Sequence, residues 1–362
     1  MERRQTYLEL IAVIRHALRK ESLPAHIHWD SLIPLAAGHR LMGFVHRALS
    51  EMPNRPEHIV KQVESAYFEA VGKQIRLDHY ADALFRLFTE REIPHMPLQG
   101  YCLRAQYPQP NWRTSQDLNI LVALEKREEV AALIEDMGFR RVNREEHDLY
   151  LLDQVKIEIR YSLSDGDLIN GGETPWDSLV TTDGISYSFS PTALYAYQMS
   201  LMHRNFSSDT GIGIRSLLDL YMCRQKLDEA DIPVLDDWFA ARGISNFARC
   251  MFDLSEVWFG DMPATNDTIL LGSYIAANGG GNGLAGSETP HASLFRRIFP
   301  SFRVMRREFK AVRCFPPLLP LFWVIRWFLL PARKKKAADA NERYRKMLDR
   351  VRELTGVESI AP

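Results

Sequence analysis

The chain has 362 residues, of which 46% are hydrophobic and 25% are charged, and this mixture is that of an ordinary globular protein. The length allows roughly two to three domains, and the composition excludes a wholly disordered, collagen-like or coiled-coil protein. The four cysteines lie far apart without a Cys-x-x-Cys pair, which excludes a zinc ribbon or thioredoxin motif and suits a reducing cytosol. No apolar signal segment opens the sequence, so we expect a cytoplasmic protein.

The net charge of −1 hides a strong asymmetry. Residues 296–336 contain twelve Lys or Arg residues and a single acid, Glu308, so this segment carries +11 and the rest of the chain −12. Such a separation of charge predicts a basic segment that binds an acidic surface, either elsewhere in the chain or on a partner.

Apolar residues recur at helical spacing through the first ninety residues. Pro53 and Pro56 separate these helices from a long helical run over residues 59–92. We therefore expect an N-terminal helical region, residues 1–92, that packs on another part of the chain.

From residue 93 onward the pattern changes to the alternation that is typical of strands. A helix over residues 126–137, closed by Gly138, interrupts this pattern. Helices resume after residue 191 and run to about residue 278. The sequence thus predicts an α+β fold in which a small α/β core, residues 93–190, is flanked by helical regions. The strands are expected at residues 93–98, 117–122, 139–142, 149–152 and 156–163.

The remaining segment, residues 279–362, begins with a glycine-rich tract. Residues 281–286 match Gly-x-Gly-x-x-Gly, but no strand precedes them and no helix follows at once, so a connector is the better interpretation. The apolar run of residues 314–330 contains three prolines and an arginine and is shorter than the ~20 residues that a spanning helix needs.

Three partners are conceivable for the basic tail. Its tryptophans, Trp323 and Trp327, and the lysines at 334–336 suit a segment that lies on an anionic membrane surface. The tail could instead dock on the acidic part of its own chain. Nucleic acid is the third option, but such dense apolar runs do not favour it.

The chemistry is concentrated in the predicted α/β core. Asp117 and Asn119 stand at positions i and i+2 of a predicted strand, so their side chains share one face. Glu158, on the polar face of another strand, could add a third oxygen ligand. Mg²⁺ prefers such oxygen ligands and often shares them with substrate phosphates. The pattern therefore indicates a site for phosphoryl transfer.

Two neighbouring residues suit a phosphate group. Gly100, at a strand-to-helix turn, would let backbone N–H groups approach a phosphate closely. Arg113 could neutralise its charge with two parallel hydrogen bonds.

A plainer interpretation stands beside each of these residues. An Asp-x-Asn pair on a strand is often only a solvated face. Glu158 lies between Lys156 and Arg160 and could belong to a surface ladder of alternating charges. Pattern alone leaves both interpretations open.

Five separated motifs over about residues 30–230 resemble the bacterial uncharacterised nucleotidyltransferase family, a divergent branch of the polymerase-β-like superfamily. The family pattern has Ile-Pro-x-x-x-Leu-Lys-Gly, Tyr-Pro, an arginine, Asp-Ile-Asp-Leu-Leu-Val and a strand with a glutamate. The helical lead-in at residues 35–40, and His203 with residues 215–220, also resemble the family. The matching positions of this chain are residues 93–100 (Ile-Pro-His-Met-Pro-Leu-Gln-Gly), Tyr107-Pro108, Arg113, residues 117–122 and Ile157-Glu158-Ile159.

The resemblance implies a nucleotidyltransferase-like sheet core and transfer of NMP from an NTP to an acceptor hydroxyl, with Mg²⁺ or Mn²⁺ as cofactor. Surface-polysaccharide or peptide modification would be the context. The catalytic residues would be Asp117 and Glu158, and the metal ligands Asp117, Asn119 and Glu158. The residues implied to bind the nucleotide are Gln99, Gly100, Arg113, His203 and Arg215.

Two departures from the family pattern fall on these positions. Gln99 stands where the family has lysine, and Asn119 stands where the family has a second carboxylate. Both changes remove a charge and weaken the expected binding of metal and nucleotide. The alternative is therefore a catalytically degenerate scaffold that binds a partner or a membrane. Arg215 also has a plainer interpretation, an i, i+4 ion pair with Asp219.

Overall fold

The structure is a computed structural model that describes residues 2–53, 55–143, 147–163, 180–181, 183–207, 211–278, 342 and 344–357. The chain divides into two compact units, one formed by residues 1–282 with 352–362 and the other by residues 283–351. The sheet, the helices around it and every predicted site residue belong to the first unit. The predicted basic strip, residues 296–336, lies outside the described residues.

Four helices form the N-terminal part, as the apolar spacing predicted: α1 (Glu2–Arg19), α2 (Trp29–Gly38), α3 (Met42–Ser50) and α4 (Glu57–Glu90). The helix α4 has 34 residues, and one of its faces buries apolar side chains, including Leu84 and Phe88, on the sheet. Pro56 precedes its first turn, where a missing backbone N–H is harmless.

The core is a five-stranded mixed sheet in the order β1-β2-β5-β4-β3. Only the β2–β5 pair is parallel, and the other neighbours are antiparallel. The short α5 (Gly100–Leu103) follows the first strand, and α6 (Arg127–Asp136) lies between the second and third. The strands are β1 (His95–Leu98), β2 (Leu118–Val122), β3 (Arg140–Asn143), β4 (His147–Leu152) and β5 (Val155–Arg160).

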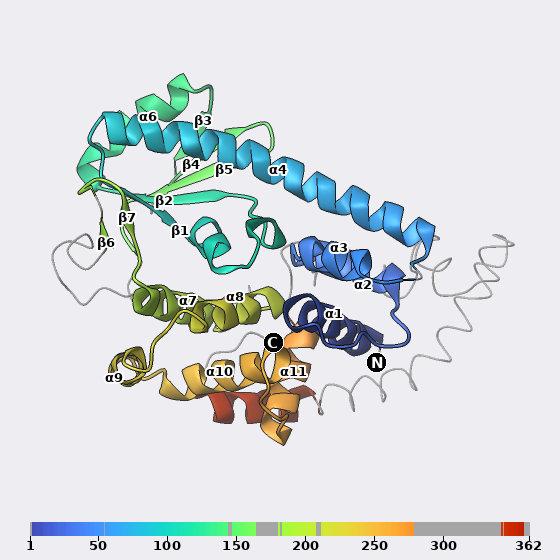
Figure 1. The fold of residues 1–362 in the computed structure, drawn as a ribbon. Helices are drawn as coiled ribbons and strands as arrows, with labels where there is room; N and C mark the ends of the chain where they lie inside the picture. Colours follow the sequence, from blue (N-terminus) through green and yellow to red (C-terminus); the bar gives the residue numbers. More distant parts are fainter. Residues whose placement is uncertain are drawn as a thin grey trace, which may run out of the picture. The chain divides into compact units, whose positions relative to one another are not determined.

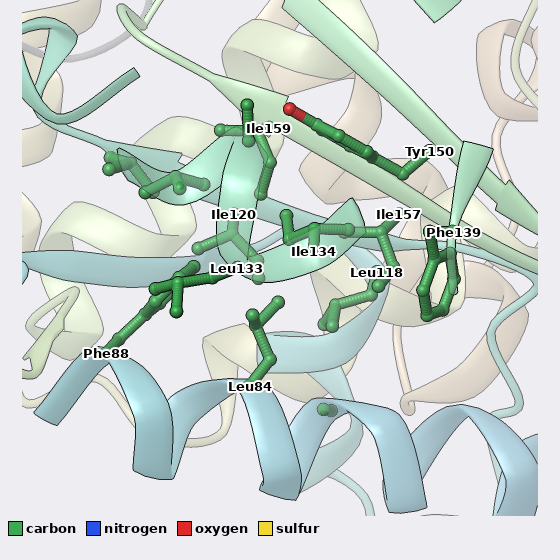
Figure 2. Close-up of a cluster of buried hydrophobic side chains, with 14 of the residues drawn as sticks. Leu84, Phe88, Leu118, Ile120, Leu133, Ile134, Phe139, Tyr150, Ile157 and Ile159 are labelled. Atoms are coloured by element: carbon green, nitrogen blue, oxygen red, sulfur yellow. The ribbon is translucent and has the colours of Figure 1, made fainter. Parts of the chain in front are cut away.

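The alternation in β2 and β5 separates two faces of the sheet. Ile120 and Ile157 point toward α4 and α6 and are fully buried there, as Figure 2 shows. Asn119 and Glu158 point to the opposite face. On that face Leu121 packs with residues of α7 (Pro191–Phe206), so the polar side chains lie next to an apolar patch.

The C-terminal helices are α7 (Pro191–Phe206), α8 (Ile214–Arg224), α9 (Asp231–Ala241), α10 (Ser245–Phe259) and α11 (Asn266–Asn278). Of these helices, α7 packs on the second face of the sheet, and α9, α10 and α11 lie beyond α7 and α8 (Figure 1). A short hairpin of β6 (Val180–Thr181) and β7 (Tyr187–Ser188) leads into them. Ser190 caps the first of these helices through a hydrogen bond from the Ala193 N–H to its hydroxyl.

The predicted α+β fold with flanking helices is confirmed, and the expected strands agree with the observed ones to within a few residues. Gly138 follows α6 with φ +90°, a conformation that favours glycine, as the predicted end of that helix required. In the described part of the chain, no helix is both long enough and apolar enough to cross a bilayer.

Candidate functional site

Three predicted oxygen ligands come together at one end of the sheet. Asn119 and Glu158 are direct neighbours in the parallel register of β2 and β5. Asp117 stands immediately before β2 and shares a face with Asn119, because successive side chains alternate. The local alternation of two strands and their parallel pairing therefore place these residues on one face.

Asn119 has an unsatisfied buried oxygen. Only 2% of the residue is exposed, and its side-chain Oδ1 has no hydrogen-bond partner in the part of the chain that the structure describes. An unpaired buried carbonyl oxygen costs about 1–3 kcal/mol, so natural proteins rarely keep one without a reason. This oxygen is available to a ligand that supplies positive charge or a proton donor.

Two cations surround the carboxylate of Glu158. The ammonium group of Lys156 contacts Glu158 Oε1 and lies 3.7 Å from Asp117 Oδ2. Arg160 Nη2 lies 3.5 Å from Glu158 Oε2. Burial by itself raises the pKa of Glu158, but Lys156 and Arg160 outweigh it and hold the pKa below its ordinary value. Glu158 is therefore a carboxylate at neutral pH, and the charge ladder that the sequence suggested is present.

The donor set fits a hard divalent cation. It consists of two carboxylates and one amide oxygen, the ligand type that Mg²⁺ and Mn²⁺ prefer, and the orphaned Asn119 oxygen is a free donor within it. Among the described residues, no three His, Cys, Asp or Glu side chains gather into a metal site. A metal here would thus depend on the amide of Asn119 as its third protein ligand.

The turn after β1 has an unusual backbone. Gln99 adopts φ +51° and ψ −124°, a left-handed conformation that side chains rarely tolerate. Its carbonyl oxygen accepts hydrogen bonds from the Leu103 N–H at 3.1 Å and the Cys102 thiol at 3.0 Å. Leu98, the residue before it, pairs with Asn119 in the sheet, so the strained turn lies at the same sheet end as the oxygen ligands.

Gly100 is needed for packing. A Cβ atom at this position would lie 2.5 Å from Ser115 Oγ and 2.7 Å from Arg113 Nη1. The absence of a side chain thus allows the start of α5 to approach the loop before β2. The predicted role in phosphate binding remains a prediction.

Arg113 is held in a buried ion pair. Its guanidinium donates from Nε to Asp219 Oδ1 and from Nη2 to Asp219 Oδ2, each at 3.1 Å, and from Nη1 to Ser115 Oγ at 3.1 Å. Tyr107 donates its phenolic hydrogen to the same carboxylate at 2.6 Å. Arg113 and Asp219 are only 4% and 3% exposed. A direct contact of Arg113 with phosphate would require these bonds to break.

Asp219 therefore does not pair with Arg215, the alternative that their i, i+4 spacing had suggested. Arg215, in the first turn of α8, is half-buried and has no hydrogen bond or ion pair with a described residue. Burial lowers the pKa of Arg215 to about 9, and the positive charges of Arg113 and Arg40 add to this effect. A half-buried guanidinium with no ion-pair partner among the described residues is suited to an anionic ligand.

Arg40 belongs to the same group of cations. It lies in the turn between α2 and α3 with φ +60°, and its guanidinium donates to the side-chain oxygen of Gln116. Burial lowers its pKa, whereas the nearby carboxylate of Asp117 acts in the opposite direction. Arg40 thus lies close enough to interact electrostatically with both Arg113 and the Asp117 carboxylate.

A pocket of about 480 Å³ with a mixed polar and apolar lining opens beside Arg40 and Lys156. Arg40, Lys73 and Lys156 line it, together with Gln116, the residue before Asp117. Lys73 pairs with Glu69 one turn away at 2.6 Å. Three cations and one acid make the lining positive, which suits an anionic substrate group.

His203 lies elsewhere. It is on α7, and its ring packs edge-on against Phe247 of α10, with ring centroids 5.1 Å apart. Leu201, two residues earlier, packs on the sheet, so His203 points away from the oxygen ligands. Burial lowers the pKa of His203. The structure therefore does not bring this predicted site residue to the others.

Two cations that line the pocket, Arg40 and Lys73, were not predicted from the sequence. Arg40 and Lys73 precede the sheet by many residues, and only the packing of α2, α3 and α4 brings them to the pocket. The position of Lys156 beside Glu158 could have been predicted, because Lys156 stands two residues before Glu158 on the same strand face.

Comparisons with known proteins place this geometry in context. A search of curated proteins found no match. The chain in the solution structure of the antibiotic-resistance factor ANT(2'')-Ia shares 16% sequence identity with this chain. The match covers 47% of this chain and 92% of that chain, with a TM-score of 0.36. The chain in the crystal structure of ANT(2'')-Ia in complex with adenylyl-2''-tobramycin shares 15% sequence identity. That match covers 46% of this chain and 97% of that chain, with a TM-score of 0.36.

The family comparison covers most of the described unit. Residues 25–260 match the family model described as uncharacterised nucleotidyltransferase. This span takes in α2 to α10, and so it includes the sheet, Asp117 and Glu158. Because the match extends over more than half of the sequence, the chain belongs to the uncharacterised nucleotidyltransferase family.

Proposed function

We propose that this protein is a divalent-metal-dependent nucleotidyltransferase that transfers NMP from an NTP to an acceptor hydroxyl. The observation that carries the proposal is the gathering of Asp117, Asn119 and Glu158 at one sheet end, with the buried Asn119 oxygen unsatisfied. Membership of the nucleotidyltransferase family supports the same reaction.

Asp117, Asn119 and Glu158 would hold the metal. A bound Mg²⁺ or Mn²⁺ ion would supply charge stabilisation at the reacting phosphate. The acceptor oxygen forms a new bond to the α-phosphorus, and the bond from that phosphorus to the leaving pyrophosphate breaks. The Glu158 carboxylate, ionised at neutral pH, accepts the acceptor proton.

The cations around the site would orient the phosphates. Among the described residues, Arg215 has no hydrogen-bond or ion-pair partner and Arg40 donates to a neutral amide, so neither would break an ion pair with these residues on binding an anion. Gln99 and Gly100 would contribute through the strained turn beside Asn119. The contacts of Arg113 and His203 already give these two residues a structural role.

Thermal unfolding of the full chain with Mn²⁺ and each of four NTPs tests the proposal. We expect one NTP to raise the melting temperature only with Mn²⁺, and Asp117→Asn to abolish the rise. Asp153→Asn is the matched control, because Asp153 lies in the exposed β4–β5 turn with φ +49°, which asparagine also tolerates. No Mn²⁺-dependent shift with any NTP would contradict the proposal.

A second candidate is a catalytically degenerate member of the family. The observation that favours it is the charge of the cluster, where Lys156 and Arg160 neutralise the two carboxylates and Asn119 adds none. The same thermal panel separates the two candidates. Activity or metal binding that appears only in Asn119→Asp would identify the natural domain as degenerate.

Attachment to an anionic membrane is part of the proposal. The basic strip of residues 296–336 and its tryptophans provide the charge and the apolar anchors that interfacial binding needs.

A further inference from the structure

Lys156 occupies an unusual place in the cluster of oxygen ligands. Its ammonium contacts the Glu158 carboxylate and also lies 3.7 Å from Asp117 Oδ2. Lys156 and Glu158 stand at i and i+2 of β5, so the strand itself directs both side chains to one face. A cation of the chain thus bridges the two carboxylates on which a metal ion would depend.

The charges of the groups within 4 Å of each other in this cluster balance. Asp117 and Glu158 supply two negative charges, and Lys156 and Arg160 supply two positive ones. The affinity of a site for a hard dication depends on the negative charge of its ligands. A divalent ion beside the ammonium group would meet strong repulsion, because two positive charges a few ångströms apart repel each other more strongly near a protein than in bulk water.

We propose that Lys156 is a built-in counter-ion that competes with the divalent metal for Asp117 and Glu158. In the metal-free protein it holds the two carboxylates near each other, and it must withdraw when the metal enters. This inference rests on the proposed function, because it presumes that these residues bind a metal. Lys156 is a positioning residue that tunes the metal affinity of the site.

The structure offers the displaced ammonium a place to go. Lys156 also lines the 480 Å³ pocket together with Arg40, and 38% of its side chain is exposed. A lysine stem is flexible, so its head can move toward the pocket without a change in the backbone. Arg160 remains beside Glu158 and stabilises that carboxylate in either position of Lys156.

Substitution of Lys156→Met in the full chain tests the inference, because methionine keeps the apolar stem and removes the charge. Mn²⁺ binding is measured without nucleotide by titration calorimetry and by the electron paramagnetic resonance of free Mn²⁺. We expect the dissociation constant to fall at least about tenfold in the variant. In EDTA, the variant should melt at a lower temperature than the natural protein, because two carboxylates then lose their shared cation.

Two controls separate this effect from a general change of charge. Lys73→Met removes a lysine from the same pocket, but Lys73 pairs with Glu69 and not with the cluster, so Mn²⁺ affinity should stay unchanged. Lys156→Arg keeps the charge and should bind Mn²⁺ as weakly as the natural protein. Lys156→Gln replaces the methionine variant if that variant does not fold.

The outcomes distinguish a failure of the proposed role of Lys156 from a failure of the proposed metal site. If the natural protein binds Mn²⁺ and the Lys156→Met variant binds it no more tightly, the proposed role of Lys156 is overturned and the proposed metal site remains. The inference also fails if Lys73→Met tightens binding as much as Lys156→Met. Absence of Mn²⁺ binding in both the natural protein and Lys156→Met would overturn the metal site and the inference with it.

Discussion

Gly100 is the residue at which close packing at the candidate site depends on a missing side chain. Alanine would place its Cβ 2.5 Å from Ser115 Oγ and 2.7 Å from Arg113 Nη1, which forces these groups to shift. We expect Gly100→Ala to destabilise the protein by about 1–3 kcal/mol, as overpacking does elsewhere. Chemical denaturation at neutral pH measures the change.

Gly72 is the matched control for this prediction. It lies inside α4, where an added Cβ would have no described atom within 4 Å apart from its chain neighbours and the backbone of its own helix. Gly72→Ala should therefore stabilise the protein by about 0.5–1 kcal/mol through its higher helix propensity. Adding Ser115→Ala to Gly100→Ala should restore part of the loss. A Gly100→Ala protein as stable as the natural one would show that the site has room.

Asp148 connects three elements of the sheet layer. Fully buried on β4, it accepts hydrogen bonds from Arg127 of α6 at 3.1 and 2.9 Å, from Arg141 of β3 at 2.7 Å, and from Tyr161 at 2.7 Å. Burial by itself raises the pKa of Asp148, but these hydrogen bonds outweigh it and hold the pKa below the ordinary 3.8. The carboxylate therefore ties α6 and β3 to β4.

A defined pH dependence follows from this lowered pKa. The stabilisation by Asp148 is fully present above the unfolded pKa and is lost as the pH falls through the lower folded pKa, that is, below 3.8. Asp148→Asn should cost about 3–5 kcal/mol at pH 7, because two arginines lose their buried partner. Denaturation at pH 7 and at steps below pH 4 should show this difference shrinking. A difference that stays constant with pH would contradict the argument.

The Arg113–Asp219 pair joins elements that lie far apart in the sequence. Arg113 precedes β2, and Asp219 lies on α8, so their two parallel hydrogen bonds connect the sheet core with the C-terminal helices. Charge-assisted pairs of this geometry also fix orientation. The position of α8, and with it Arg215, beside the candidate site thus depends on a contact that local spacing does not reveal.

At the level of the whole molecule, the separation of charge gives a prediction about the tail. The natural protein should bind vesicles that contain phosphatidylserine, with affinity that falls as salt rises, and should bind phosphatidylcholine vesicles much less. Deletion of residues 314–336 should abolish binding in a sedimentation assay. Alanine at all three positions 334–336 should weaken it by about 1 kcal/mol per charge while keeping the apolar run.

Equal binding to neutral vesicles, or binding that survives the deletion, would contradict a role of the tail in attachment to anionic lipid. Docking of the tail on the acidic remainder of the chain would then become the better interpretation. The thermal panel with NTP and Mn²⁺ reads a different property, so its result does not depend on this one.

Much of this protein could be predicted from its sequence, because the period of apolar residues depends on local geometry. Alternation along β2 and β5 was enough to place Asp117, Asn119 and Glu158 on a polar strand face, with Ile120 and Ile157 on the opposite face. The three residues then come together because the fold places these two strands side by side as a parallel pair.

Tertiary structure decided which charges meet. Local spacing suggested a pair between Arg215 and Asp219, yet α8 packs so that Asp219 meets Arg113, 106 residues away, and Arg215 makes no ion pair with any residue that the structure describes. Packing likewise brings Arg40 beside Asp117, and it sends His203 to the far side of α7. The spacing of residues along an element sets the face on which each side chain lies. Which side chain from another element it then contacts depends on how elements far apart in the sequence pack together.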